Sequence, residues 1–415
     1  MDYTRFFLNN RKILLFAVIL TFYSGFGQTF LLSLYIPHII GEFGISQSLF
    51  STIYASATLC SGFAIIFAGK LIDRIPLIKF TMVVIAGIIL ANTVAGFSAN
   101  LIMLFAGFFL LRFFGQGLLS HTAMTSMGRY FTQARGKALS IAYLGFPLAE
   151  AIFPITIVSI ILAIGWRESF LASGLFILIT LVPLSIFLLK NFDSKKVVEG
   201  FSSRQSSKTQ KPAPIVQRFW SQKQIVKDLN FYIYAPTAFI TGFTLTAIFF
   251  FQTFIAGFKG WSIEWMALSI AAYAISSLVF SVLTGPAIDR FSARKIFPFI
   301  LIPMAVGLWV LILFSHPAAA VIFWFLTGIS AGANPTTGNA LYAETYGVKS
   351  LGSIRSIFTF VMISSTAAGP VIYSLFIDKG YTYDHIHVVI TAVILLNMLF
   401  ILWGFRKQSR QKMMH

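Results

Sequence analysis

The chain has 415 residues, of which 57% are hydrophobic and only 11% are charged. Soluble globular chains carry about 25% charged residues, so this composition excludes an ordinary soluble domain. The formal net charge of +18 would suit a nucleic-acid ligand, but the placement of the basic residues, described below, excludes that partner.

Apolar runs recur along the whole chain, each of about the 20 residues that a helix needs to cross a bilayer. The first run, Ile13 to Ile36, is too long for the apolar core of a signal peptide, so we interpret it as a spanning helix. The sequence therefore predicts an all-α membrane protein with twelve transmembrane helices. They are expected at residues 13–36, 48–71, 80–97, 101–127, 137–163, 168–189, 231–255, 263–287, 296–314, 318–343, 352–376 and 387–405.

Lys and Arg are distributed unevenly between the two sides that these helices define. If the N-terminus lies inside, 27 of the 31 basic residues fall on inner segments, and Arg167, Lys259 and Lys379 fall on outer loops. Basic residues resist translocation and concentrate on cytoplasmic loops. We therefore expect both termini in the cytoplasm and the chain in a cell membrane, such as the inner membrane of a bacterium. The same bias explains the net charge without an anionic partner.

The longest polar stretch separates two halves, which we place at residues 1–190 and 229–415. Residues 191–228 have the Ser, Pro and Lys content of a linker. The end of this linker, Ile215 to Val226, mixes apolar and basic residues, which suits either an interfacial helix or a disordered tether. The single cysteine, Cys60, excludes an internal disulfide and a cysteine-built metal site, and we expect no cofactor.

The two halves repeat at an offset of 216 residues. The segment Gly69 to Lys79 recurs as Gly285 to Lys295, with an Ile-Asp-Arg core in both copies. The same offset, without a gap, maps Thr21 on Thr237, Gly136 on Gly352 and Pro154 on Pro370. Matches of Gly and Pro at a fixed spacing indicate two six-helix pseudo-repeats. Parallel repeats of this kind build transporters that hold a solute between the halves.

The repeated loop resembles the Gly-x-x-x-Asp-Arg-x-Gly-basic signature of the major facilitator superfamily, with Pro76 in place of the second glycine of the first copy. The resemblance covers the whole chain and implies the major facilitator fold. It also implies a gating role for both copies of the loop. The glycines would permit close helix approach, and the aspartates would brace the inner helix ends. These residues are Gly69, Asp73 and Arg74 in the first copy and Gly285, Asp289 and Arg290 in the second.

A second resemblance lies at the junction between helices four and five. Gly128-Arg-Tyr-Phe131 and Arg135-Gly-Lys-Ala138 look like the same junction in monocarboxylate and oxalate–formate porters. The acidic residue that monocarboxylate porters often carry in helix one is replaced here by the segment Tyr23 to Gly27.

Two charged residues lie deep in the predicted spans, Arg112 in helix four and Glu150 in helix five. A charge at the bilayer centre costs about 2.5–3.5 kcal/mol even on lenient scales, so each is a candidate functional residue. These helices are adjacent and antiparallel, so the two charges could form an ion pair. The repeat maps them on Gly328 and Thr366, which are neutral. This asymmetry favours a site over general architecture, although a purely structural pair stays open.

Polar side chains at helical spacing extend this candidate site. The resemblance implies that helices one, four, seven and ten surround the cavity, and each carries such a polar stripe. An alternative is that these groups bond their own backbone or neighbouring helices. The expected solute-binding residues are Arg112, Gln116, Gln28, Ser24, Thr241, Thr244 and Asn334, with Glu150 as the proton-coupling residue.

These observations predict a secondary active transporter that moves a small solute by alternating access and acts as a monomer. An organic anion such as a carboxylate is expected, bound by Arg112 and coupled to protons through Glu150. The alternative is a proton-driven exporter of amphipathic compounds or metal chelates, which the 46 Phe residues would suit. A membrane-embedded enzyme would need clustered His, Asp or Cys at membrane depth, and the sequence lacks such a cluster.

Overall fold

The computed structural model describes the chain except residues 1–2, 132–134, 191–219, 221, 347–350 and 414–415, and the described part contains helices and no strand. The chain packs into two compact units. Unit 1 holds Met1–Ile45 and Ser56–Ile215, and unit 2 holds Ser46–Ala55 and Val216–His415. The predicted domain borders at residues 190 and 229 stay predictions, because the linker between them lies mostly outside the described residues.

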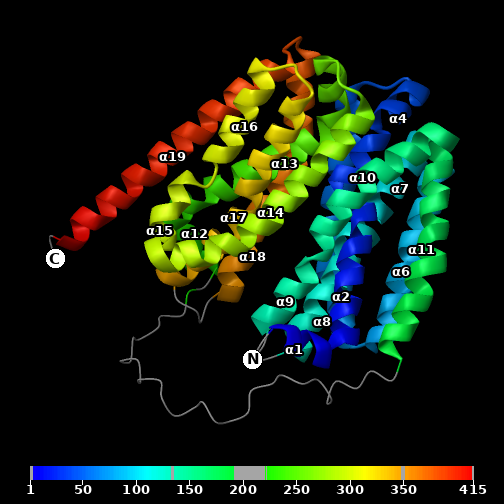
Figure 1. Cartoon of the computed structure of the whole chain (residues 1–415), viewed down its shortest axis with the longest axis horizontal. Helices are drawn as coiled ribbons and strands as arrows, with labels where there is room; N and C mark the ends of the chain where they lie inside the picture. The colour runs from blue at the N-terminus through cyan, green and yellow to red at the C-terminus, as the bar shows by residue number, and fades with distance from the viewer. Residues whose placement is uncertain (1–2, 132–134, 191–219, 221, 347–350, 414–415) are drawn as a thin grey trace. The chain divides into compact units, whose positions relative to one another are not determined.

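Within each half the helices follow one another with short connections, and the linker joins α11 to α12 (Figure 1). Those up to the linker are α1 (Tyr3–Asn9), α2 (Arg11–Tyr23), η1 (Ser24–Gly27), α3 (Thr29–Leu32), η2 (Ser33–Tyr35), α4 (Ile36–Phe43), α5 (Gln47–Ala68), η3 (Gly69–Asp73), α6 (Leu77–Gly96), α7 (Leu101–Leu110), η4 (Leu111–Leu119), α8 (Ser120–Tyr130), α9 (Arg135–Tyr143), α10 (Gly145–Ile164) and α11 (Trp166–Leu189). Those after it are α12 (Gln222–Lys227), α13 (Leu229–Lys259), α14 (Ile263–Phe291), α15 (Ala293–Ile296), η6 (Phe297–Phe299), α16 (Ile302–Leu313), α17 (Ala318–Tyr346), α18 (Leu351–Asp378) and α19 (Tyr383–Met413).

Eleven described helices are long and apolar enough to cross a membrane, and a bent pair adds a twelfth. That pair, Arg11–Gly27 and Thr29–Phe43, bends by 40°. Helices suit a bilayer because each satisfies its backbone polar groups within one segment. The twelve-helix prediction is confirmed, but the first span is broken and reaches Phe43 rather than running straight from 13 to 36.

Small residues set the helix packing inside each unit. In unit 1, a Cβ at Gly25 would stand 2.9 Å from the Cβ of Ala149 on α10. In unit 2, a Cβ at Gly332 would stand 3.0 Å from the Cα of Ser277 on α14. Any larger side chain would clash at these distances, so these glycines allow the backbones of neighbouring helices to come close.

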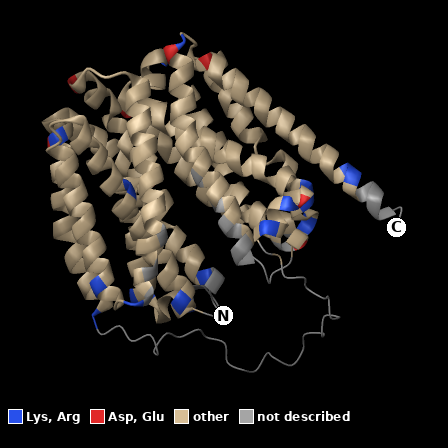
Figure 2. Ribbon diagram, turned by 180° about the vertical axis from the view of Figure 1, so that it is seen from behind, with Lys and Arg blue, Asp and Glu red and all other residues tan. Residues whose placement is uncertain are grey.

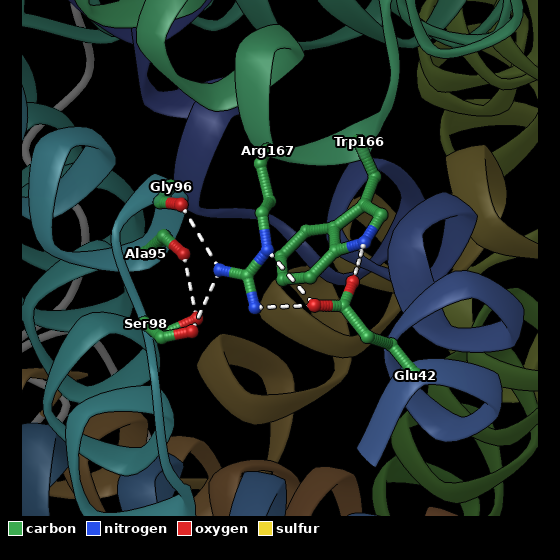
Figure 3. Close-up of polar contacts among 6 residues, drawn as sticks. All are labelled: Glu42, Ala95, Gly96, Ser98, Trp166 and Arg167. Carbon is green, nitrogen blue, oxygen red and sulfur yellow. Dashed lines mark hydrogen bonds and ion pairs between the residues drawn. The ribbon is translucent and has the colours of Figure 1, made fainter. Parts of the chain in front are cut away.

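A polar cluster around Glu42 and Arg167 lies at one end of unit 1 (Figure 3). The guanidinium of Arg167 pairs with Glu42 at 2.7 Å and donates to the carbonyl oxygens of Gly96 (3.1 Å) and Ser98 (2.6 Å). It also lies 4.3 Å from the ring centre of Trp166, whose indole N–H donates to Glu42 at 2.8 Å. The cluster ties α4, α6 and α11 together.

Unit 2 carries a related cluster with the charges exchanged. Lys259, at the end of α13, pairs with Asp384 of α19 at 3.1 Å and donates to the carbonyl oxygen of Ile312 at 3.4 Å. At the 216-residue offset, Ile312 corresponds to Gly96 and Asp384 to Glu168. Each cation therefore reaches an equivalent carbonyl group, but its acidic partner comes from a different helix of the repeat.

Basic residues gather at one end of each unit, the end that carries the N-terminus in unit 1 and α15 in unit 2 (Figure 2). The linker also ends in a short helix, α12, with Lys223 and Lys227 exposed and Ile225 buried. This agrees with the interfacial-helix interpretation for residues 222–227, while residues 215–219 lie outside the described part of the chain.

Candidate functional site

The first span loses its helical geometry at Gln28. After α2 the chain forms one 3₁₀ turn, Ser24–Gly27, and Gln28 then adopts an extended conformation with ψ of 152°. Helix resumes at Thr29. Discontinuous helices that expose helix ends at membrane depth are a recurring feature of transporter binding sites. The break leaves the carboxyl end of one helical segment and the amino end of the next at the same depth.

The fourth span departs from α geometry at the matching depth. Its middle, Leu111–Leu119, is π-helical and includes Arg112, Gly115 and Gln116. Single π turns inside α-helices often occur at functional sites. A Cβ on Gly115 would stand 2.8 Å from both the Cα and the amide nitrogen of Gly27, so the two irregular backbones touch directly.

Arg112 connects these two irregular segments. One terminal nitrogen of its guanidinium donates to the carbonyl oxygen of Gly27 at 3.1 Å and to the hydroxyl of Thr29 at 3.2 Å. The side chain is only 2% exposed. The cation therefore bonds the residues on either side of Gln28, and it lies at the carboxyl end of η1, where a positive charge is favoured. Thr29 was not predicted as a site residue, although it directly follows Gln28, which was.

The other predicted residues of unit 1 lie around this contact. Gln28 and Gln116 are half-buried, one at the break and one in the π-helical segment. Ser24 is fully buried, and its hydroxyl donates to the carbonyl oxygen of Thr21 at 2.6 Å. Ser24 therefore satisfies a backbone group of its own helix, which was the alternative interpretation of these polar stripes.

The ion pair that Arg112 and Glu150 could have formed is absent from the described residues. Glu150 is half-buried on α10, and no ion pair joins it to a cation among the described residues. The neighbouring side chains of Ala149 and Phe153 face Gly25 of η1. Arg112 bonds the break in the first span instead, because that break supplies a backbone carbonyl and a hydroxyl within reach of the guanidinium.

In unit 2 the structure brings two predicted residues together. The side-chain amide of Asn334 on α17 donates to the hydroxyl of Thr241 on α13 at 3.1 Å. Thr244 is fully buried, and its hydroxyl has no hydrogen-bond partner within the described parts of the chain. Asn397 of α19 donates to Thr237 at 3.0 Å, a link between helices seven and twelve that sequence reasoning missed.

The two copies of the repeated loop differ in packing. His121 of α8 forms a hydrogen bond of 3.1 Å with the carbonyl oxygen of Gly69, and a Cβ at Gly69 would lie 3.1 Å from the same ring nitrogen. A Cβ at Gly285 would meet nothing within 4 Å, so the predicted close approach is wrong for that glycine. Arg74 and Arg290 are exposed, and the Arg290 guanidinium lies 5.2 Å from the Phe291 ring centre. The side chains of Asp73 and Asp289 lie outside the described residues.

The sequence matches the family model of the Major Facilitator Superfamily over residues 17–272 and 234–413. The chain belongs to this superfamily. As a member of it, the protein is a multi-pass membrane transporter rather than an enzyme, and the major facilitator fold expected from the repeated loop is confirmed.

Solved structures of two superfamily transporters resemble the chain closely in fold. A bacterial homologue of the human lysosomal transporter Spinster, in an inward-facing and unoccupied conformation, has a TM-score of 0.64 and 13% identity, with 95% of each chain covered. The nucleoside transporter NupG has a TM-score of 0.71 and 10% identity, with 96% of this chain and 99% of that chain covered. A comparison with curated protein sequences gave no match.

Proposed function

We propose that the protein is a secondary active transporter of small organic anions, with carboxylates as the substrate class and protons as the coupling ion. The observation that supports this proposal is the buried guanidinium of Arg112 at the break in the first span. Arginine is the side chain best suited to bind a carboxylate, because its planar guanidinium offers two parallel donors.

The electrostatics of the break also favour an anion. The segment that begins at Thr29 presents its amino end at the break, and the amino end of a helix carries partial positive charge. The carboxyl end of η1 carries partial negative charge, and Arg112 already bonds its last carbonyl, that of Gly27. The field left at Gln28 is therefore positive. The substrate carboxylate would replace the Gly27 carbonyl and the Thr29 hydroxyl as the partner of Arg112.

This exchange would couple binding to movement. When the guanidinium turns to the substrate, the two backbone segments on either side of Gln28 lose the hydrogen bonds that join them through Arg112. The bend of the first span can then change, which alternating access requires. In unit 2, Thr241, Thr244 and Asn334 are proposed as neutral solute-binding groups.

Glu150 would carry the coupled proton. It is the second of the two charged residues deep in the predicted spans, and it has no cation partner among the described residues. A carboxyl group at membrane depth can take up a proton where an arginine cannot release one. Because Glu150 does not pair with Arg112, its proton and the substrate would act at separate places in the unit.

Uptake into proteoliposomes tests these roles. A panel of mono- and dicarboxylates should accumulate when the outside is acidic, with one class accumulating most. Arg112→Gln and Arg112→Lys should lose both accumulation and exchange, because Gln carries no charge to attract a carboxylate and Lys replaces the planar two-donor group with a point charge. Glu150→Gln should lose pH-driven accumulation and keep exchange. Normal carboxylate exchange by Arg112→Gln would reject the anion site, and normal accumulation by Glu150→Gln would reject the proton role.

The orientation of the chain is part of the same proposal. In a Cys60→Ser background, cysteines at the exposed positions Ala99, Ser315 and Lys379 should react with an impermeant thiol reagent added to intact cells. Cysteines at Ser203 and Ser409 should react only after the membrane is opened. The reverse pattern would place both termini outside.

A further inference from the structure

A groove in unit 2 lies between the short helix α12 and the start of α18. It has a volume of about 550 Å³ and is lined by Gln222, Lys223, Val226, Lys227, Ile357 and Phe360. That volume falls in the range of small-molecule sites, roughly 300–1,000 Å³. The groove thus combines two cations with an apolar wall.

The two lysines share one face of α12. Lys223 and Lys227 are four residues apart and both exposed, while Ile225 is fully buried and anchors the helix. Like charges at this spacing repel each other and destabilise a helix. The acid next in sequence, Asp228, faces other partners: it accepts from the backbone of Asn230 at 2.8 Å and from the hydroxyl of Tyr346 at 3.1 Å. An anion in the groove would offset the repulsion between the lysines.

The groove lies beside the starts of two candidate membrane spans. The span that follows α12 begins at Leu229, and the apolar part of α18 begins at Phe360. Phe360 is 70% exposed, which suits a side chain against lipid. A ligand in the groove therefore has its charged end at headgroup depth and an apolar surface leading into the membrane.

We propose that this groove binds one anionic phospholipid. The phosphate would lie between Lys223 and Lys227, and an acyl chain would lie along Val226, Ile357 and Phe360. Basic pockets at the ends of transmembrane helices recognise acidic headgroups in this way. The site is independent of the proposed substrate and of its coupling ion.

A second groove offers a matched comparison. It has a volume of about 430 Å³, is lined mostly by apolar residues of α14, α16 and α17, and Lys295 is the basic residue in its lining. It has the apolar wall without the pair of cations. The phosphate of a lipid there would contact one lysine rather than two, so Lys295 serves as the control position.

Native mass spectrometry of the full chain tests the site, with phosphatidylglycerol and phosphatidylcholine titrated separately. The wild-type protein should bind phosphatidylglycerol more tightly than phosphatidylcholine. The double variant Lys223→Gln/Lys227→Gln should weaken phosphatidylglycerol binding by about tenfold to thirtyfold, since each lysine contributes electrostatically to binding an acidic lipid. Lys223→Arg/Lys227→Arg should restore the binding, and Lys295→Gln should leave it unchanged.

Four outcomes would contradict the proposal or a part of it. Unchanged phosphatidylglycerol binding in the double Gln variant would remove the role of the lysines. Equal binding of phosphatidylcholine to the wild-type protein would remove the selectivity for anionic lipid. If soluble glycerol-3-phosphate displaced the lipid at equal concentration, the groove would be a phosphate site rather than a lipid site. Weaker phosphatidylglycerol binding in Phe360→Ser would support the acyl-chain contact, and unchanged binding would contradict it.

Discussion

The contact between helices one and four differs in kind from that between their counterparts, helices seven and ten. In unit 1 an interrupted helix meets a π-helical segment around a buried arginine. In unit 2, α13 and α17 run as α-helices of 31 and 29 residues, and a neutral hydrogen bond from Asn334 to Thr241 joins them. None of the described glycines of α13 and α17 brings these two helices together: they pack on α14 or α18, on Tyr342 of α17 itself, or on no neighbour within 4 Å.

A few substitutions account for this difference. The 216-residue offset pairs Gly27 with Phe243, Gly115 with Ala331 and Arg112 with Gly328. Two glycines let the backbones touch in unit 1, and the arginine bonds both sides of the resulting break. In unit 2 the larger Phe243 excludes the same backbone contact, and no cation is present at Gly328 to hold a broken helix. The repeat thus preserves the spans, while three positions decide where the backbone is irregular.

The largest effect should follow from filling the backbone contact. A Cβ on Gly27 would overlap the backbone of Leu111 and Gln116, which cannot move aside as a side-chain end could. Overpacking commonly costs about 1–3 kcal/mol, and Gly27→Ala should reach or exceed the upper end. Thermal unfolding in detergent measures the loss. Gly41→Ala is the control, because a Cβ there meets nothing within 4 Å. Equal stability of the two variants would show that the contact is looser than described.

The next effect compares the hydrogen bonds of the two contacts. Arg112→Met should destabilise the protein by about 1.5–3 kcal/mol for each charged hydrogen bond lost. Asn334→Ala should cost only about 0.6 kcal/mol, the average for polar contacts between membrane helices. Denaturant unfolding of both variants checks the order. A double-mutant cycle with Thr241→Val isolates the neutral bond, and a coupling energy as large as the Arg112 effect would contradict the contrast.

A smaller effect should distinguish the two ion-pair clusters. The side chains of Arg167 and Glu42 are 27% and 47% exposed, whereas those of Lys259 and Asp384 are 5% and 29% exposed. Salt screens exposed pairs far more than buried ones. Arg167→Gln should therefore cost up to about 1 kcal/mol at low salt, and less at high salt.

The loss in Lys259→Gln should stay nearly constant with salt, because Lys259 is shielded from the solvent. Unfolding curves at two salt concentrations measure both variants. The same salt dependence in both would show that burial does not separate the two clusters.

The smallest effect concerns the repeated loop. Gly285→Ala should leave stability unchanged or raise it by up to about 1 kcal/mol, since alanine favours a helix and nothing opposes its Cβ. Gly69→Ala should slow transport, because its methyl group crowds the imidazole of His121. Initial uptake rates in proteoliposomes compare the two. Normal transport in Gly69→Ala would argue against a gating role for this copy.

The spans were predictable because the bilayer requires long apolar helices, and that requirement holds whatever the local irregularity of the backbone. The break at Gln28 was not predictable by the same means. Residues 13–36 are mostly apolar and contain no proline, and two glycines alone weaken a helix without fixing where it ends. What stops it is the contact of Gly27 with Gly115 and Arg112, more than 80 residues away. The Gly25-Phe-Gly27 segment beside Gln28, and the glycines on either side of Gln116, were the visible signals.

The candidate site was likewise predictable in part from the sequence. Arg112 stood out because a charge in a span is rare, and its burial is confirmed. Glu150 was considered as its partner because the two residues lie at similar depth on adjacent antiparallel helices, and neither fact fixes which side of a helix faces which neighbour. Asn334 and Thr241 were each chosen from helical spacing, and the structure joins them. Whether the two units present these groups to one solute stays a prediction.

The π-helical segment also makes helix four shorter than it would be as a continuous α-helix. The repeat runs through helices four and ten without a gap, so Leu111–Leu119 occupies as many residues as its α-helical counterpart. Hydrogen bonds to the fifth rather than the fourth residue make a wider and shorter coil. If those bonds shifted to α geometry, α8 would advance and rotate relative to α7 without any change in sequence or connection. A change from π to α geometry would thus lengthen helix four, whereas helix ten is already α-helical and cannot lengthen in this way.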